Sequence, residues 1–78
     1  MKIKIKEKSK YGGRIIAHRG NQEVGYLIYH IDLYEDKKIT VSQLDARYPY
    51  DRNEVEDVLL SYMYETYANE GYKIRCEY

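Results

Sequence analysis

The sequence has no phenylalanine and no tryptophan, and it holds only one cysteine and one proline. A single cysteine can form neither an internal disulfide nor a pair of zinc thiolates, which fits a reducing compartment. No apolar run approaches the roughly 20 residues that span a bilayer, and the lysine-rich start lacks the apolar stretch of a signal peptide. These absences predict a cytoplasmic protein with no membrane partner.

Net charge is also absent, because thirteen basic residues balance thirteen acidic ones. The two signs are separated along the chain. Residues 1–20 hold seven basic residues and one acidic one, whereas residues 51–70 hold six acidic residues and one basic one. The balanced total argues against a nucleic-acid binder that depends on net charge, since phosphate binding usually shows as a basic excess. The basic N-terminal strands leave a local nucleic-acid contact open, although a solvated strand is the favoured interpretation.

Alternating apolar and polar residues predict five strands, near residues 2–8, 13–19, 23–34, 37–44 and 72–78. In the third strand the apolar set moves from even to odd positions after Ile28. A similar shift occurs between Val41 and Leu44. Such a shift indicates a bulge, or a sheet that is covered on both sides.

A helix is predicted near residues 52–69, with Asp51 and Glu54 as a capping box and Gly71 just beyond its end. Its spacing gives two apolar stripes, which together are wider than one sheet face usually covers. Either the sheet curls around the helix or part of this arc contacts a partner, and the second interpretation is favoured. The first stripe consists of Val55, Val58, Leu59, Tyr62, Met63 and Thr66, and the second of Leu60, Tyr64 and Tyr67. The fold class is therefore α+β, a single domain (residues 1–78) with a mainly antiparallel sheet and the order β-β-β-β-α-β.

Three segments carry a family resemblance: Glu23-Val24-Gly25-Tyr26-Leu27-Ile28-Tyr29, the strand Ile39 to Leu44, and the stretch from Glu54 to Ile74 with Asn69-Glu70-Gly71 at its turn. In this order they resemble the central part of the GNAT acetyltransferase family, over residues 22–78. The resemblance implies that the loop before the helix binds acetyl-CoA. Arg47, Arg52 and Asn53 would then be the residues nearest the cofactor.

The same loop departs from the family's glycine-rich pattern. It contains no glycine, Pro49 lacks one N–H group, and Asp51 and Glu54 place negative charge where the pyrophosphate should lie. The segments that form the family's first helices and its late strands, including its general-acid tyrosine, have no counterpart here. We therefore predict no cofactor, and keep a minimal acetyltransferase that binds acetyl-CoA as the enzymatic alternative.

Few side chains offer catalytic chemistry. His30 and Asp32 share one face of a strand, but a surface pair is favoured over a base or a ligand. Cys76 lies on the apolar face of the alternating last strand, which favours a small core residue over a nucleophile. We therefore predict no catalytic residue and no metal ligand.

Tyrosine is abundant, with eleven residues, and its amphipathic ring suits surfaces that bind something. The sequence therefore favours a non-enzymatic protein-binding module. Small size and tyrosine content are also typical of phage and mobile-element accessory proteins, including anti-CRISPR inhibitors, an analogy of composition only. The further alternative is a homodimer joined by the second helix stripe or the final strand. The predicted partner-binding residues are Tyr48, Tyr50, Glu56, Asp57, Leu60, Tyr64 and Tyr67.

Overall fold

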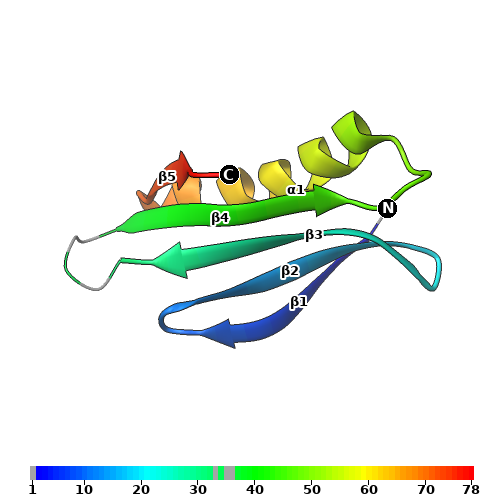
Figure 1. Cartoon of the computed structure of the whole chain (residues 1–78). Coiled ribbons are helices and arrows are strands. Elements are labelled where there is room, and N and C mark those ends of the chain that lie inside the picture. Colours follow the sequence, from blue (N-terminus) through cyan, green and yellow to red (C-terminus); the bar gives the residue numbers. More distant parts are fainter. Residues whose placement is uncertain (1, 33, 35–36) are drawn as a thin grey trace.

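The computed structural model describes residues 2–32, 34 and 37–78, which form a five-stranded sheet with one long helix across one of its faces (Figure 1). The predicted α+β class and the predicted order of elements are confirmed. The strands are β1 (Lys2–Ser9), β2 (Gly12–Arg19), β3 (Gln22–Ile31), β4 (Lys38–Ala46) and β5 (Lys73–Cys76); the helix α1 (Arg52–Tyr67) and a short 3-10 helix, η1 (Ala68–Glu70), lie between β4 and β5.

The strands lie side by side in chain order, with β1 and β5 as the two outer strands. The first four pair antiparallel, as neighbours joined by tight turns do. Strand β5 pairs parallel to β4, because α1 forms the crossover that returns the chain to the same end of the sheet. The sheet is therefore mixed, and mainly antiparallel as predicted. Among the described residues, no helix is long and apolar enough to cross a membrane.

Strand β3 ends at Ile31, earlier than the predicted end at residue 34. The carboxylate of Asp32 accepts a hydrogen bond of 2.8 Å from the backbone N–H of Tyr34, which is the bond of an Asx turn. Leu33, which the prediction placed in the strand, lies outside the described residues. The last strand is also shorter than predicted, since it covers residues 73–76.

Two irregularities in strand register bring apolar residues to the helix side. In the β3–β4 pair, Ile28 pairs with Gln43 and Tyr29 pairs with Val41, so that Ser42 is the extra residue. Val41 and Leu44 are therefore both buried, which confirms the predicted shift between them. The predicted shift of face after Ile28 was wrong, because β3 alternates regularly from Gly25 to Tyr29 and the extra residue opposite Ile28 and Tyr29 belongs to β4.

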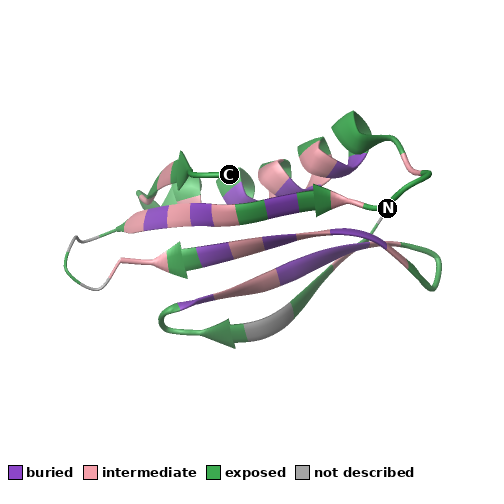
Figure 2. Ribbon diagram, viewed as in Figure 1, coloured by how far each residue is buried: buried purple, intermediate pink, exposed green. Residues whose placement is uncertain are grey.

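The second irregularity lies between β2 and β3, where Ala17 pairs with Gly25 and His18 with Glu23. Val24 is the extra residue and is fully buried. Gly25 lies directly below the helix, because a Cβ built on it would be 2.4 Å from Cγ1 of Val55. Ile16 is fully buried on the side of the sheet away from the helix. The other buried apolar residues lie between the helix and β2, β3 and β4, whose buried stretches are purple in Figure 2. They are Ile15, Ala17, Val24, Leu27, Tyr29, Ile39, Val41, Leu44, Val55, Leu59 and Met63.

The ends of α1 follow local signals. The carboxylate of Asp51 accepts hydrogen bonds from the backbone N–H groups of Asn53 (2.9 Å) and Glu54 (3.3 Å), which confirms the predicted N-cap. The side chain of Glu54 does not complete a capping box; it pairs with Arg19 at 2.6 Å. At the other end the α-helix stops at Tyr67, before the predicted residue 69, and Gly71 has the left-handed φ of 89° that ends the following 3-10 turn.

Cys76 is exposed, and the prediction that it lies in the core was wrong. It pairs with Val41 and thus follows the alternation that the sequence indicates. However, β5 is an outer strand of the sheet, so no further strand shields it on that side. Alternation decides which way a side chain points, but burial also requires a neighbouring element on each side.

Candidate functional site: a tyrosine surface beside the last strand

The predicted partner-binding residues lie in three separate places. Four of them, Glu56, Leu60, Tyr64 and Tyr67, follow one flank of α1 at helical spacing. Asp57 lies on the other side and lines a shallow groove of about 340 Å³ that includes Ile3 of β1. Tyr48 and Tyr50 belong to the loop before the helix. Tyr64 is about 18 Å along the helix axis from the first helical residue, so the loop and the flank form different surfaces.

Two half-exposed tyrosines, Tyr64 and Tyr78, lie near each other beside β5. Tyr64 is 48% exposed and Tyr78 is 56% exposed. A hydrogen bond with Cys76, and then partial burial, raise the pKa of Tyr78 to about 12, and the nearby Glu56 and Tyr64 add to this shift. These neighbours place Tyr78 against the flank of α1. We call Glu56, Leu60, Tyr64, Cys76 and Tyr78 the tyrosine patch.

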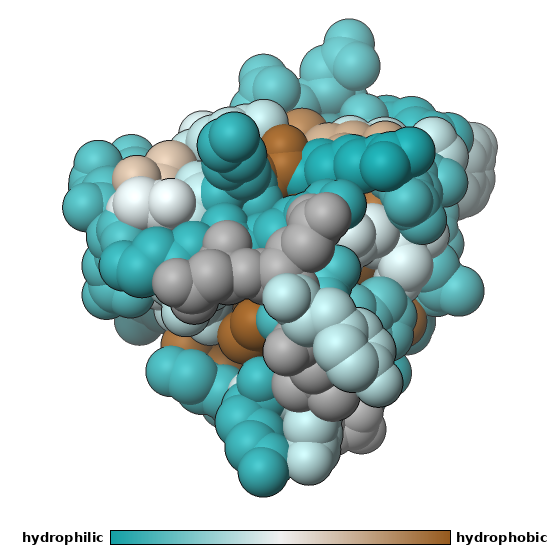
Figure 3. Space-filling model, turned by 90° about the vertical axis from the view of Figure 1, so that its left-hand side faces the viewer, coloured by the Kyte–Doolittle hydropathy of each residue, from teal (hydrophilic) through white to brown (hydrophobic). Residues whose placement is uncertain are grey.

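The patch is amphipathic. Leu60 is half-buried and packs against the core, so it fixes the base of the patch. Glu56 keeps its charge near the surface and pairs with Arg52 one helical turn earlier, at 3.1 Å. At the end of the molecule that carries the β3–β4 turn, hydrophilic residues prevail and apolar ones show only as separate spots (Figure 3). In the patch itself, the large apolar side chains that are exposed are Tyr64 and Tyr78, whereas Leu60 is half-buried.

Tyr78 was not among the predicted site residues. The sequence pattern indicated only that Tyr78 shares one side of the final strand with Tyr72, Ile74 and Cys76. That side is exposed at the end of β5, where the chain passes the outer flank of α1. The position of Tyr78 follows from the parallel pairing of β5 with β4, which no local sequence signal specifies.

Tyr67 belongs to the core and not to the exposed patch. Its hydroxyl lies 2.9 Å from the hydroxyl of Tyr29, which is fully buried. Its ring lies 5.6 Å from that of Tyr29 and meets the ring of Tyr72 edge-on at 5.5 Å. This cluster accounts for much of the wide apolar arc of α1, because the curled sheet and the β5 segment cover Tyr67.

The Tyr29–Tyr67 contact predicts a loss of stability at high pH. Burial, and then the hydrogen bond to Tyr67, raise the pKa of Tyr29 above its ordinary value of 10.0. The folded state therefore resists deprotonation, so this contribution to stability is complete below about pH 10 and is lost as the pH rises further. Between about pH 9 and pH 11 the free energy of unfolding should fall by about 1.4 kcal/mol through this residue alone.

Tyr29→Phe isolates the effect of Tyr29 from that of the other tyrosines and the lysines. Urea unfolding of both proteins at several pH values gives the difference in their free energies of unfolding. We expect this difference to shrink by the amount stated as the pH rises. A difference that stays constant would show that Tyr29 ionises equally readily in the folded and unfolded chains.

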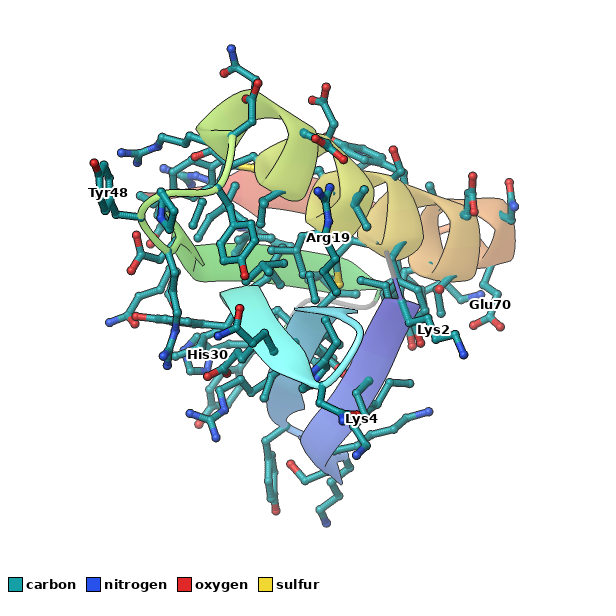
Figure 4. All side chains as sticks on the ribbon, turned by 90° about the vertical axis from the view of Figure 1, so that its right-hand side faces the viewer. Lys2, Lys4, Arg19, His30, Tyr48 and Glu70 are labelled. Atoms are coloured by element: carbon teal, nitrogen blue, oxygen red, sulfur yellow. The ribbon has the colours of Figure 1, made fainter. Side chains whose placement is uncertain are left out.

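The two loop tyrosines differ in exposure and in the contacts that they already make. Tyr48 is 97% exposed and projects away from the body of the molecule (Figure 4). Tyr50 is half-buried, donates a hydrogen bond from its hydroxyl to Oε1 of Gln22, and lies below the guanidinium of Arg19, 6.0 Å from the ring centre. Only Tyr48 of this pair is free to contact a partner without leaving existing contacts.

The loop does not fit a pyrophosphate. Arg47 is paired with Glu23 at 2.6 Å and Arg52 with Glu56 at 3.1 Å. The N–H groups of Asn53 and Glu54, which would receive phosphate oxygens at a helix N-terminus, already donate to Asp51. The carboxylate of Asp51 thus occupies the position that the cofactor would need.

Comparison of the chain with protein-family models, with curated proteins and with solved structures gives no match. His30 is exposed, and Asp32 uses its carboxylate in the turn after β3. Within residues 2–32, 34 and 37–78, no three His, Cys, Asp or Glu side chains gather where they could hold a metal ion. The most distinctive surface feature of α1 is therefore the tyrosine patch.

Proposed function

We propose that this chain is a small, non-enzymatic protein-binding module whose partner contacts the tyrosine patch. The observation that carries the proposal is the pair of half-exposed rings, Tyr64 of α1 and Tyr78 just after β5, with Glu56 in the same neighbourhood. Tyrosine offers a large rigid contact area with few rotatable bonds, and its hydroxyl can bond across an interface. Tyrosine is accordingly enriched among the residues that dominate binding energy.

The patch is built for contact in two further respects. Its base is fixed, because Leu60 packs on the core and the backbone of α1 holds Tyr64. Its rim is charged, since the carboxylate of Glu56 lies within the patch and pairs with Arg52 at 3.1 Å. A rigid aromatic centre with a charged rim fits a partner that presents an apolar pocket flanked by basic side chains.

The same proposal extends to the class of partner. By analogy with phage and mobile-element accessory proteins, including anti-CRISPR inhibitors, the partner is a subunit of a host complex that the module blocks. Size and tyrosine content support this analogy. It names a class of partner to test first and adds nothing to the argument from the patch.

The test is the affinity for a partner that has been captured with the wild-type chain and then purified. Tyr64→Ala should weaken binding by roughly 30-fold or more, as removal of a central aromatic anchor does. Tyr34→Ala is the matched control, because Tyr34 is almost fully exposed and lies in the turn after β3, outside the patch. We expect the control to bind like wild type and both variants to keep the circular dichroism of the parent.

Unchanged affinity of Tyr64→Ala for the partner would contradict the assignment of the patch. If the captured partner is a second copy of the chain, light scattering will show a mass that rises with concentration, and the homodimer alternative will replace the module. A monomer mass at all concentrations would exclude that alternative.

A further inference from the structure

The tertiary structure sorts the balanced charges of this chain onto two faces. Gly25 faces the helix, so its register partners Ala17 and Ile3 do as well. The alternate set, which includes Lys4, faces the other side. No helix covers that side, and we call it the open face (Figure 1). The six acidic residues of positions 51–70 lie in α1 or at its two ends, on the opposite layer.

Register identifies the side chains of the open face. One row across the sheet runs Lys4, Ile16, Tyr26 and Asp45. The rows on either side place Lys2 with His18, and Arg14 with Ile28. The part of this face formed by β1 and β2 therefore carries basic side chains around Ile16, which is fully buried beneath its neighbours, and the half-buried Tyr26.

Two hollows flank this centre. One, of about 300 Å³, includes Tyr11, Arg14 and His30 in its lining. The other, of about 340 Å³, is lined by the turn after β2 together with Lys2, Lys4 and His18. Arg14 and His18 are four residues apart on one strand, so the two hollows are about 13 Å apart along β2.

The first hollow combines three planar groups. The ring of Tyr11 is 50% exposed and has the ammonium of Lys10 5.0 Å from its centre. His30 is exposed at the adjacent position of β3, and Nε of Arg14 is buried within the sheet face. Exposed rings such as those of Tyr11 and His30 stack on nucleobases, while the surrounding cationic groups attract phosphates.

We propose that the open face binds single-stranded nucleic acid along β1 and β2. Bases stack at the hollow of Tyr11 and His30, and the phosphates that follow lie against Lys2 and Lys4. A single strand is specified because a duplex keeps its bases stacked on one another, so that they cannot reach Tyr11. An acidic protein could pair with the same lysines, but its carboxylates would not stack on the rings of Tyr11 and His30.

Among the described carboxylates on this side, that of Asp32 accepts the N–H of Tyr34 in the turn after β3. Glu23 is paired with Arg47 at 2.6 Å, and Asp45 belongs to β4, which β2 and β3 separate from β1. The proposal does not rest on the tyrosine patch, since the patch belongs to the helix layer. Tyr64→Ala should therefore leave nucleic-acid binding unchanged, and the two proposals can fail separately.

The test is fluorescence anisotropy of the full chain with a labelled single-stranded oligonucleotide of roughly ten nucleotides. With about four phosphate contacts, the affinity should fall roughly 50-fold as the salt rises from about 50 to about 200 mM. Lys4→Glu should weaken binding roughly tenfold or more at low salt. Arg52→Glu is the matched control: it makes the same change in net charge on the helix layer, and it should bind like wild type.

Tyr11→Ala tests the stacking contact. It should weaken binding roughly tenfold without changing the salt dependence, because it removes a base contact and no charge. Absence of binding at low salt would overturn the proposal. Equal affinity for a duplex, with no effect of Tyr11→Ala, would reduce it to unspecific attraction by charge. Equal competition by polyglutamate would assign the face to an acidic protein instead.

Discussion

Gly25→Ala is expected to lower the free energy of unfolding by about 3 kcal/mol or more, which is a large part of the stability of a domain of this size. A Cβ at this position would lie 2.4 Å from Cγ1 of Val55 and 2.5 Å from the carbonyl oxygen of Asp45. The carbonyl belongs to the neighbouring strand and Val55 to the helix. Relief of the clash would therefore have to move the helix layer and disturb the β3–β4 pairing together.

Urea unfolding followed by circular dichroism measures this loss. Gly20→Ala is the control, because no atom lies within 4 Å of a Cβ at that turn and only the positive φ of 62° opposes the change. Its cost should be about 1 kcal/mol. If Gly25→Ala proves as stable as this control, the close approach of α1 to β3 is not present in solution.

Leu59→Ala should cost about 2–5 kcal/mol, the range for removing a buried leucine side chain and leaving a cavity. Leu59 is fully buried at the centre of the face that α1 turns to the sheet. The surrounding residues come from both layers, so they cannot close the cavity without moving the helix or a strand. The same unfolding measurement applies.

Leu60→Ala is the matched control for this variant, since it removes the same atoms one position along the helix. Leu60 is half-buried, and solvent can fill part of the space it leaves, so a loss of about 1 kcal/mol is expected. Equal losses for the two variants would mean that α1 is rotated about its axis relative to the sheet. The comparison thus tests the orientation that places Tyr64 in the patch.

Local sequence patterns predicted the elements because the interactions that define them are local. Asp51 caps the helix through N–H groups two and three residues away, and Gly71 ends the chain reversal with its own backbone. The spacing of Ile39, Val41 and Leu44 predicted an extra residue in β4, because three buried positions with that spacing cannot all alternate. Each of these signals depends only on residues that are close together in the sequence.

The candidate site was less predictable, because burial depends on which element lies opposite. Tyr64 and Tyr67 belong to the same helical stripe, yet Tyr67 bonds to Tyr29, 38 residues earlier, and Tyr64 remains exposed. Cys76 and Tyr78 alternate with the polar residues of the last strand, yet both are exposed because β5 is an outer strand. These long-range contacts decide which part of the apolar arc of α1 remains exposed to a partner.

By itself the sequence determined the class of fold, the order of the elements, the helix cap and the balance of charge. Only the tertiary structure decided that the balance consists of a basic open face and an acidic helix layer, and that Tyr78 lies near Tyr64. Periodicity and capping depend on residues within one or two turns of one another, whereas the faces of the molecule depend on strand register and on the parallel return of β5.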